Sequence, residues 1–328
     1  MRDFSKKYLY EVISIGEATV DAFMTLDNPR EALQGDNKDH TICLRQGAKT
    51  EVDHYDLCVG GNATNVAVGL KRMGINVGLC TEIGDDELSL KIRNTLAKEE
   101  IERLLVKQTN GPTNFSVILN FQGDRNLFVK NVERTHEFDF SDVVAPLVFL
   151  TSLGNEWKKA YKNVLEFVGG NKSTLAFNPG TRQLREGHDV VMEVLKEADL
   201  LFVNKEEAEL LAKEEKIEET SSEYMEKLAR HLQHIGQVKL VVITDGKKGS
   251  YALDEHGEFY FRETGKGKIV ERTGAGDAYT SGFLAACLSG LAIEKAMEWG
   301  TQNATSVVGA VGAQKGLLTK KQMHEEVR

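Results

Sequence analysis

The chain has 328 residues, 41% of them hydrophobic, and its 41 Lys and Arg against 50 Asp and Glu give a formal net charge of −9. This mildly acidic balance disfavours nucleic acid as a partner, and the length allows a large buried core. Four scattered cysteines without CxxC spacing indicate neither a zinc site nor a disulfide framework, and no apolar run is long enough to span a membrane. We therefore expect a cytoplasmic protein that acts away from membranes.

Short apolar runs alternate with longer amphipathic stretches along most of the chain. The apolar runs predict strands at 11–16, 77–84, 147–154, 174–180, 200–204 and 239–244. The amphipathic stretches predict helices at 62–74, 86–100, 161–170 and 221–236. Strands that are apolar throughout are typical of a sheet covered on both faces, so the alternation predicts an α/β fold with a doubly wound, mostly parallel sheet.

Two stretches break this alternation. Residues 22–58 contain no convincing helical pattern, and residues 113–131 read as two strands joined at Gly123 and Asp124. Segments of about 22–58 and 112–131 could together form one small β appendage that acts as a lid over the carboxyl ends of the main strands. The alternative is an edge hairpin with no role in ligand binding.

The stretch ERTGAGDAYTSGF, residues 271–283, places small residues directly before a predicted helix. Unpaired N–H groups and the positive dipole end at a helix start attract anions, so Gly274, Ala275 and Gly276 are candidates for a phosphate cradle. Asp277 could accept the proton of a hydroxyl that attacks the phosphoryl group. A carboxylate suffices as base when a loose transition state delays proton removal. The alternative is an aspartate that only stabilises the helix start.

A second glycine pair, Gly60 and Gly61, precedes the predicted helix at 62–74, and Asn62 and Asn65 stand near the start of that helix. Glycines beside amide side chains suit close hydrogen bonding to a polyhydroxylated ligand. Taken alone, the pattern is better interpreted as a tight turn before a core helix.

Three ordered motifs make a family resemblance specific. They are Gly60-Gly61-Asn62-Ala63, Asn204-Lys205-Glu206-Glu207 and Thr273-Gly274-Ala275-Gly276-Asp277. In this order and separation they resemble the ribokinase (PfkB) family of carbohydrate kinases, over roughly residues 11–318. The resemblance implies a single domain over residues 1–328 with a three-layer αβα fold and a small β-sheet lid. It also implies transfer of the ATP γ-phosphoryl group to a sugar, nucleoside or related hydroxyl.

The resemblance assigns catalytic roles to individual residues. It implies that Asp277 is the catalytic base. It also implies that the anion hole is formed by Gly274, Ala275 and Gly276. It further implies that Asn204 and Glu207 place Mg²⁺ largely through water, which suits the reluctance of this ion to shed its waters. The same pair could form a capping box at a helix start, and the two roles are compatible.

Two ligand sites follow from the same resemblance. The residues expected to bind the acceptor hydroxyls are Asp21, Gly60, Gly61 and Asn65. The residues expected beside the nucleotide are Thr244, Gly246 and Gly249, with Asn303 near the adenine. Asn178 and Arg182 fall where members of the family often reach the phosphates, although Arg182 could also be a solvent-facing charge.

Glu271 departs from the family pattern, because many members have Asp at this position. In several relatives that carboxylate helps to bind a monovalent cation. The glycine-rich stretch at 308–316 still resembles the loop that supplies carbonyl groups to such an ion. K⁺ therefore stays an open expectation beside ATP and Mg²⁺.

We predict an ATP-dependent kinase for a small-molecule sugar, sugar acid or nucleoside. A nucleoside kinase of the same fold is the alternative within the class. From another class, the glycine-rich turns allow a dinucleotide-binding oxidoreductase, although GGNATN lacks the GxGxxG order. Alternating apolar residues in the lid, such as Val117, Leu119 and Phe121, permit a homodimer without requiring it.

Overall fold

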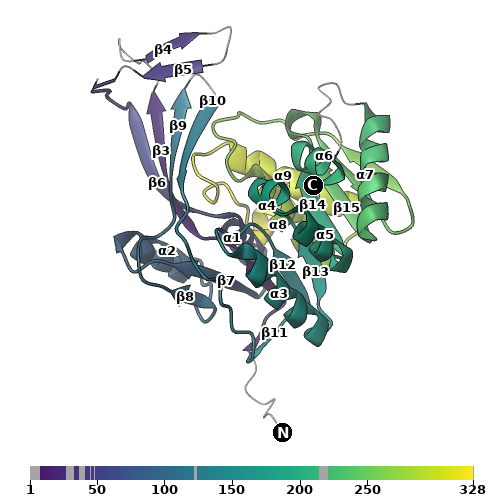
Figure 1. Ribbon diagram of the computed structural model, residues 1–328. Coiled ribbons are helices and arrows are strands. Elements are labelled where there is room, and N and C mark those ends of the chain that lie inside the picture. The colour runs from purple at the N-terminus through teal and green to yellow at the C-terminus, as the bar shows by residue number, and fades with distance from the viewer. Residues whose placement is uncertain are drawn as a thin grey trace.

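The computed structural model describes residues 8–26, 33–36, 41–44, 46–47, 49–121, 124–213 and 221–327. Its main sheet has nine strands in the order β17-β16-β15-β14-β13-β12-β2-β7-β8 (Figure 1). The bounds are β2 Val12–Ile15, β7 Val77–Ile83, β8 Val106–Gln108, β12 Leu147–Leu150, β13 Thr174–Phe177, β14 Leu200–Asn204, β15 Leu240–Thr244, β16 Ser250–Leu253 and β17 Phe259–Arg262. A separate pair consists of β1 Tyr8–Leu9 and β11 Val143–Val144. The strands from β15 to β8 run parallel, which confirms the predicted mostly parallel sheet.

Helices cover both faces of this sheet, because neighbouring residues of each buried strand point to opposite sides. Ile13 and Ile15 belong to one hydrophobic core, and Val12 belongs to the other. The first core is covered by α3 Trp157–Asn171, α4 Thr181–Glu186, α5 His188–Glu197, α6 Lys205–Ala212 and α7 Ser222–Gly236. The second is covered by α1 Asn62–Arg72, α2 Glu87–Lys98, α8 Ala275–Leu288, α9 Ile293–Val308 and α10 Lys320–Glu326. The three-layer αβα order is therefore confirmed.

A smaller sheet is built from strands that are far apart in the sequence. Its order is β10-β9-β3-β6, and its strands are β3 Thr19–Leu26, β6 His54–Gly60, β9 Phe115–Phe121 and β10 Asp124–Lys130. β3 pairs antiparallel with β6 and parallel with β9, so the two segments that break the alternation meet in one sheet. Figure 1 shows this small sheet projecting from one side of the main sheet.

The small sheet differs in detail from the expected segments. β3 already begins at Thr19, and β6 continues to Gly60. Within the first segment, β4 Leu33–Asp36 and β5 Thr41–Leu44 form a separate two-stranded sheet at the far end of the small sheet (Figure 1). Gly123 of the predicted turn lies outside the described residues.

Helix α8 is held in place by close packing against α9. The sequence AGDAYTSGFLAACL has small or apolar residues on most sides of the helix, so nearly the whole helix is buried. The backbone of α9 passes so close to Gly282 that a Cβ there would lie 2.6 Å from the carbonyl oxygen of Trp299. Although α8 is strongly apolar, no described helix is both long and apolar enough to cross a membrane. This packing fixes the position of the first turn of α8.

We expect Gly282→Ala to lower the free energy of unfolding by about 1–3 kcal/mol, because the new methyl group forces α8 and α9 apart. Gly169→Ala in α3 is the matched control, since a Cβ at Gly169 meets nothing within 4 Å. The control should raise stability by up to about 1 kcal/mol or leave it unchanged. Urea unfolding of both variants measures the difference, and equal stabilities would contradict the close approach of the two helices.

Candidate active site

Two cavities meet at the start of α8. The first, here called the cradle cavity, has a volume of about 290 Å³ and is lined by Gly274, Ala275 and Gly276. The second, the small-sheet cavity, has a volume of about 340 Å³ and is lined in part by side chains of β3, β9 and β10. The residues that line both cavities are Asn62, Glu207, Gly274 and Asp277. Ligands in the two cavities can therefore meet at these residues.

The first turn of α8 forms the cradle. Gly274 begins the helix with a left-handed φ of 81°, and a side chain there would collide with Ala313. The N–H of Ala275 donates to the carbonyl of Arg272 at 3.3 Å. The N–H groups of Gly276 and Asp277 have no acceptor within the helix, as is usual in a first turn, and they line the cradle cavity. These donors lie at the positive end of the helix dipole, so they suit an anion.

Asp277 is a buried carboxylate at the junction of the two cavities. It accepts a hydrogen bond from Asn65 Nδ2 at 2.8 Å, and Gln314 Nε2 donates to Asn65 Oδ1 at 2.9 Å. Burial raises the pKa of Asp277 to about 7; the Asn65 hydrogen bond opposes this rise, and the carboxylates of Glu207 and Asp21 add to it. A carboxylate with this pKa can exchange a proton near neutral pH.

Glu207 faces the same junction from the start of α6. It forms a capping box with Asn204: Glu207 N donates to Asn204 Oδ1 at 2.9 Å, and Asn204 N donates to Glu207 Oε2 at 3.1 Å. The predicted capping role is therefore confirmed. Burial raises the pKa of Glu207 to about 7, although its hydrogen bonds with Asn204 and Thr181 oppose the rise.

The junction fits a Mg²⁺ ion bound mainly through water. Within the described ranges, no group of three or more His, Cys, Asp or Glu side chains could enclose a metal ion. Glu207 and Asp277 both face the junction, and the charge of Glu207 raises the pKa of Asp277. Two carboxyl groups that face one junction suit an ion that keeps several waters and binds phosphate oxygens.

Asp21 of β3 reaches the small-sheet cavity. Its carboxylate accepts a hydrogen bond from Thr19 Oγ1 at 3.0 Å, and burial raises its pKa. Gly60 leaves room for this carboxylate, because a side chain at Gly60 would collide with it. Gly61 has φ 97°, and a side chain there would collide with the carbonyl of Glu17. Gly61 lines the cavity, whereas Gly60 acts behind Asp21.

The residues expected near phosphates and nucleotide are partly brought together. Thr244 at the end of β15 and Asn178 line the cradle cavity, whereas Arg182 lines the small-sheet cavity. Gly246 and Gly249 lie in and after the turn that follows β15, and neither lines either cavity.

Asn303 lies apart from the rest of the predicted site. It is fully buried in α9, where its amide donates to Ala278 O and accepts from Leu318 N, both at 2.9 Å. Its side chain therefore joins α9 to α8 and to the loop after α9, and it lines neither cavity.

Arg125 of β10 is a site residue that the sequence analysis did not identify. It lines the cradle cavity, and its Nη1 donates to Glu271 Oε1 at 2.8 Å and to Thr273 Oγ1 at 2.6 Å. The N–H groups of Arg272 and Thr273 donate to the same Glu271 oxygen. Burial works to raise the pKa of Glu271, but these hydrogen bonds outweigh it and hold the pKa below its ordinary value. Glu17 at the small-sheet cavity was likewise not identified.

A backbone anion cradle beside a buried carboxylate, placed where two cavities meet, is the arrangement of a small-molecule phosphotransferase. Residues 12–320 match the model of the pfkB family of carbohydrate kinases, so the chain belongs to this family. The resemblance carried by the three sequence motifs is thereby confirmed. The alternative of a dinucleotide-binding oxidoreductase has no support from this assignment.

Relatives within the family carry different substrate names. The chain is 26% identical to a 5-dehydro-2-deoxygluconokinase of Clostridium beijerinckii, over 82% of this chain and 84% of the relative. It is also 26% identical to a nucleoside kinase of Methanocaldococcus jannaschii, over 79% of this chain and 82% of the relative. The structure of Arabidopsis thaliana ribokinase complexed with ribose and ATP has a TM-score of 0.75 at 16% identity and covers 98% of this chain and 99% of its own. This last likeness shows the fold.

The raised pKa of Asp277 predicts a stability cost at high pH. Because the folded-state pKa of about 7 exceeds the ordinary value of 3.8, the contribution of Asp277 to stability is greatest below pH 3.8 and is lost as the pH rises through 7. We expect Asp277→Asn to raise the free energy of unfolding at pH 8 by about 1–3 kcal/mol and to have a smaller effect at pH 5. Denaturant unfolding at both pH values measures this, with the exposed Asp142→Asn as control. Equal effects of Asp277→Asn at the two pH values would contradict the raised pKa.

Proposed function

We propose that this protein transfers the γ-phosphoryl group of ATP to a hydroxyl of a sugar or sugar-like acceptor. The observation that carries the proposal is the position of Asp277, which lines both cavities and adjoins the free N–H groups of the α8 first turn. Phosphate bound at these N–H groups and a hydroxyl bound in the small-sheet cavity would both lie beside this carboxylate. Membership of the pfkB family of carbohydrate kinases supports the same reaction.

In the proposed reaction Asp277 takes the proton of the acceptor hydroxyl. Its pKa of about 7 lets it be ionised before transfer and protonated after it at neutral pH. The N–H groups of Gly276 and Asp277 stabilise the charge that develops on the transferring phosphoryl group. Asn65 holds the carboxylate by its hydrogen bond of 2.8 Å, and Gln314 fixes the amide of Asn65.

We propose that ATP lies along the cradle cavity, beside Thr244 and towards Gly246 and Gly249. Mg²⁺ would be held by Glu207, with Asn204 acting through water, and would neutralise phosphate charge at the junction. The exposed amide of Asn204 and the carboxylate of Glu207 line the cradle cavity, which supports this placement. The reaction would take place in the cytoplasm.

We further propose that the chain works as one ribokinase-like unit in which the small sheet is a lid. Ile118, Leu127 and Val129 of this sheet line the small-sheet cavity, and a closed apolar wall there would exclude water from the reaction. Exposed apolar side chains, among them Tyr55 and Phe128, lie on the same sheet, so we propose that two chains can pair through it.

A nucleoside is the second candidate acceptor. The apolar side chains Ile118, Leu127 and Val129 could contact a base while Asp21 binds ribose hydroxyls. The relative named nucleoside kinase supports this candidate, and the relative named 5-dehydro-2-deoxygluconokinase supports a sugar-like acceptor.

We expect Asp277→Asn to lower kcat by about 10²–10⁴-fold while nucleotide affinity stays within about threefold, because only proton transfer is lost. The measurement is ADP release over a panel of sugars, sugar acids and nucleosides, with calorimetry for nucleotide binding. Asp142→Asn is again the control and should retain the wild-type rate. Near-normal turnover of Asp277→Asn would remove the assigned base.

Replacing K⁺ by tetramethylammonium at equal ionic strength should change kcat by less than about twofold, because a charge-assisted hydrogen bond from Arg125 already serves the Glu271 carboxylate. Arg125→Gln leaves this carboxylate without its guanidinium, so K⁺ should stimulate the variant more than it stimulates the wild type. A wild-type enzyme that loses most of its activity without K⁺ would contradict this expectation.

A further inference from the structure

Glu17 is a carboxylate in the wall of the small-sheet cavity, directly after β2. Asn114 Nδ2 donates to Glu17 Oε1 at 2.8 Å, and Val132 N donates to Asn114 Oδ1 at 2.9 Å. The backbone donor fixes the orientation of the Asn114 amide, so its NH₂ group must face Glu17. No other described group donates a hydrogen bond to this carboxylate, which leaves Oε2 able to accept one from a ligand.

His136 lies behind Glu17. A Cβ built on Gly154 would lie 3.0 Å from Glu17 Oε1 and 3.6 Å from His136 Nε2, so both atoms border the same small space. His136 is 4% exposed, and its Nε2 has no hydrogen-bond partner among the described residues. Its φ of 48° is left-handed, a conformation that is uncommon for residues other than glycine.

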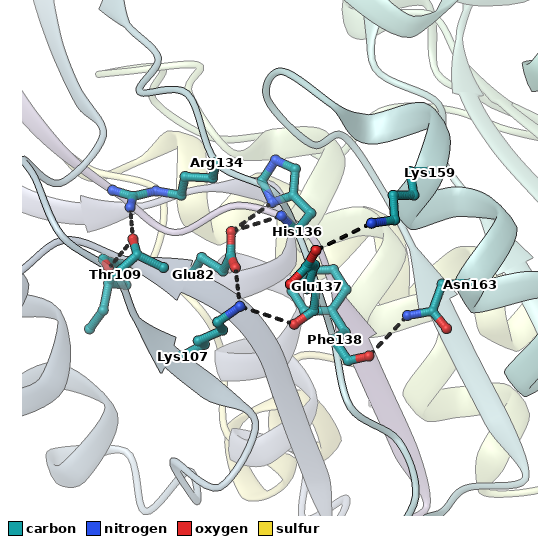
Figure 2. Close-up of polar contacts among 10 residues, drawn as sticks. Glu82, Lys107, Thr109, Arg134, His136, Glu137, Phe138, Lys159 and Asn163 are labelled. Atoms are coloured by element: carbon teal, nitrogen blue, oxygen red, sulfur yellow. Dashed lines mark hydrogen bonds and ion pairs between the residues drawn. The ribbon is translucent and has the colours of Figure 1, made fainter.

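Glu82 of β7 holds His136 in this position. His136 N donates to Glu82 Oε2 at 3.1 Å, and His136 Nδ1 lies 3.3 Å from the same oxygen. Figure 2 shows the Glu82 carboxylate between His136 and Lys107, whose Nζ lies 3.3 Å from Glu82 Oε1. Arg134 donates to Thr109 and so fastens the same segment to the edge of the main sheet (Figure 2). A run of polar contacts thus leads from Lys107 at the surface through Glu82 to His136.

The small-sheet cavity is rich in carboxyl groups. The carboxylates that line it are Glu17, Asp21, Glu207 and Asp277, and among its described lining residues Arg182 alone is basic. Arg182 is already engaged, since it donates to Glu186 Oε2 at 2.9 Å and to Asn155 Oδ1 at 2.5 Å. An anionic acceptor therefore finds no unengaged basic side chain among these lining residues, whereas the hydroxyls of a neutral acceptor can donate to the carboxyl oxygens.

Neighbouring groups limit how far burial raises the pKa of Glu17. Burial raises the pKa of Glu17, and the nearby charge of His136 and the Asn114 hydrogen bond oppose that rise. Arg182 and Arg134 act in the same direction as His136. Glu17 held by these contacts offers a fixed oxygen that can accept a hydrogen bond from a hydroxyl.

We propose that Glu17 binds an acceptor hydroxyl and selects uncharged polyols over sugar acids and sugar phosphates, and that His136, anchored on Glu82, positions Glu17. The proposal rests on the proposed kinase function and names the substrate class of the same site. His136 is a positioning residue, because Glu17 lines the cavity and His136 does not.

The test compares neutral acceptors (D-ribose, D-fructose, myo-inositol and inosine) with anionic ones (D-gluconate and D-fructose 6-phosphate). Turnover is followed by ADP release, and affinity is followed by calorimetry with a nonhydrolysable ATP analogue and Mg²⁺ present. We expect the wild type to bind and phosphorylate a neutral acceptor at least about tenfold better than either anion. Glu17→Gln should raise KM and Kd for that acceptor about tenfold, with kcat and the KM for ATP within about twofold. The ratio of neutral to anionic kcat/KM should fall by at least about tenfold.

Two further variants separate positioning from folding. His136→Asn tolerates the left-handed φ and should raise the acceptor KM about threefold to tenfold without changing kcat. Glu137→Gln is the matched control, because the exposed carboxylate of this neighbour pairs with Lys159 at the surface. Thermal melting shows whether each variant is folded. If Glu17→Gln unfolds, Glu17→Asp replaces it, because this variant keeps the carboxyl group. Glu17→Asp should keep the preference for neutral acceptors and raise the acceptor KM.

The outcomes distinguish this inference from the proposed function. A wild type that prefers an anionic acceptor, or a folded Glu17 variant with unchanged KM and Kd, overturns the inference and leaves the kinase function intact. Absence of turnover with every acceptor removes the proposed function, whereas the calorimetric preference for neutral acceptors and its loss in Glu17→Gln would still support the site. If His136→Asn lowers kcat, ATP affinity and melting temperature together, His136 has only a structural role, and its positioning role is overturned.

Discussion

The position of the buried Asp277 carboxylate in the open first turn of helix α8 organises this molecule. Asp277 and the free N–H groups of the α8 first turn can meet a ligand together only if the start of α8 borders a cavity and is held firmly in place. The hold comes from α9, which packs against Gly282, and from Ala313, which packs against Gly274. The exposure comes from the ends of parallel strands, where α/β sheets commonly bind ligands. Burial then raises the pKa of Asp277 to a value suited to proton exchange.

The small sheet contributes both chemistry and a wall. Its strand β3 carries Asp21 into the small-sheet cavity, while β10 brings Arg125 to the loop before the cradle. Movement of this sheet would therefore alter the acceptor cavity and the surroundings of Glu271 together. Glu82 of β7 holds both Lys107 and His136, so this side of the acceptor cavity is joined to the edge of the main sheet.

The parts of the structure that the sequence predicted are those with local patterns. Uniformly apolar runs predicted the parallel sheet, because each buried strand packs against a layer of helices on both of its faces. The glycines before α1 and α8 predicted helix starts. Arg125 and Glu271 could not be paired in this way, because they are 146 positions apart and Arg125 belongs to no local motif. For Asn303 the resemblance predicted a place near the adenine, and that stays a prediction; the sequence did not show that its amide joins α9 to α8.

The hydrogen bond between Gln314 and Asn65 has a consequence for biosynthesis. These side chains are 249 positions apart, and Asn65 in turn orients Asp277. A nascent chain emerging from the ribosome could complete the strands around β2 and β7 long before Gln314 is made. Any fragment that stops short of Gln314 would carry every motif up to the aspartate and still lack the donor that holds the Asn65 amide.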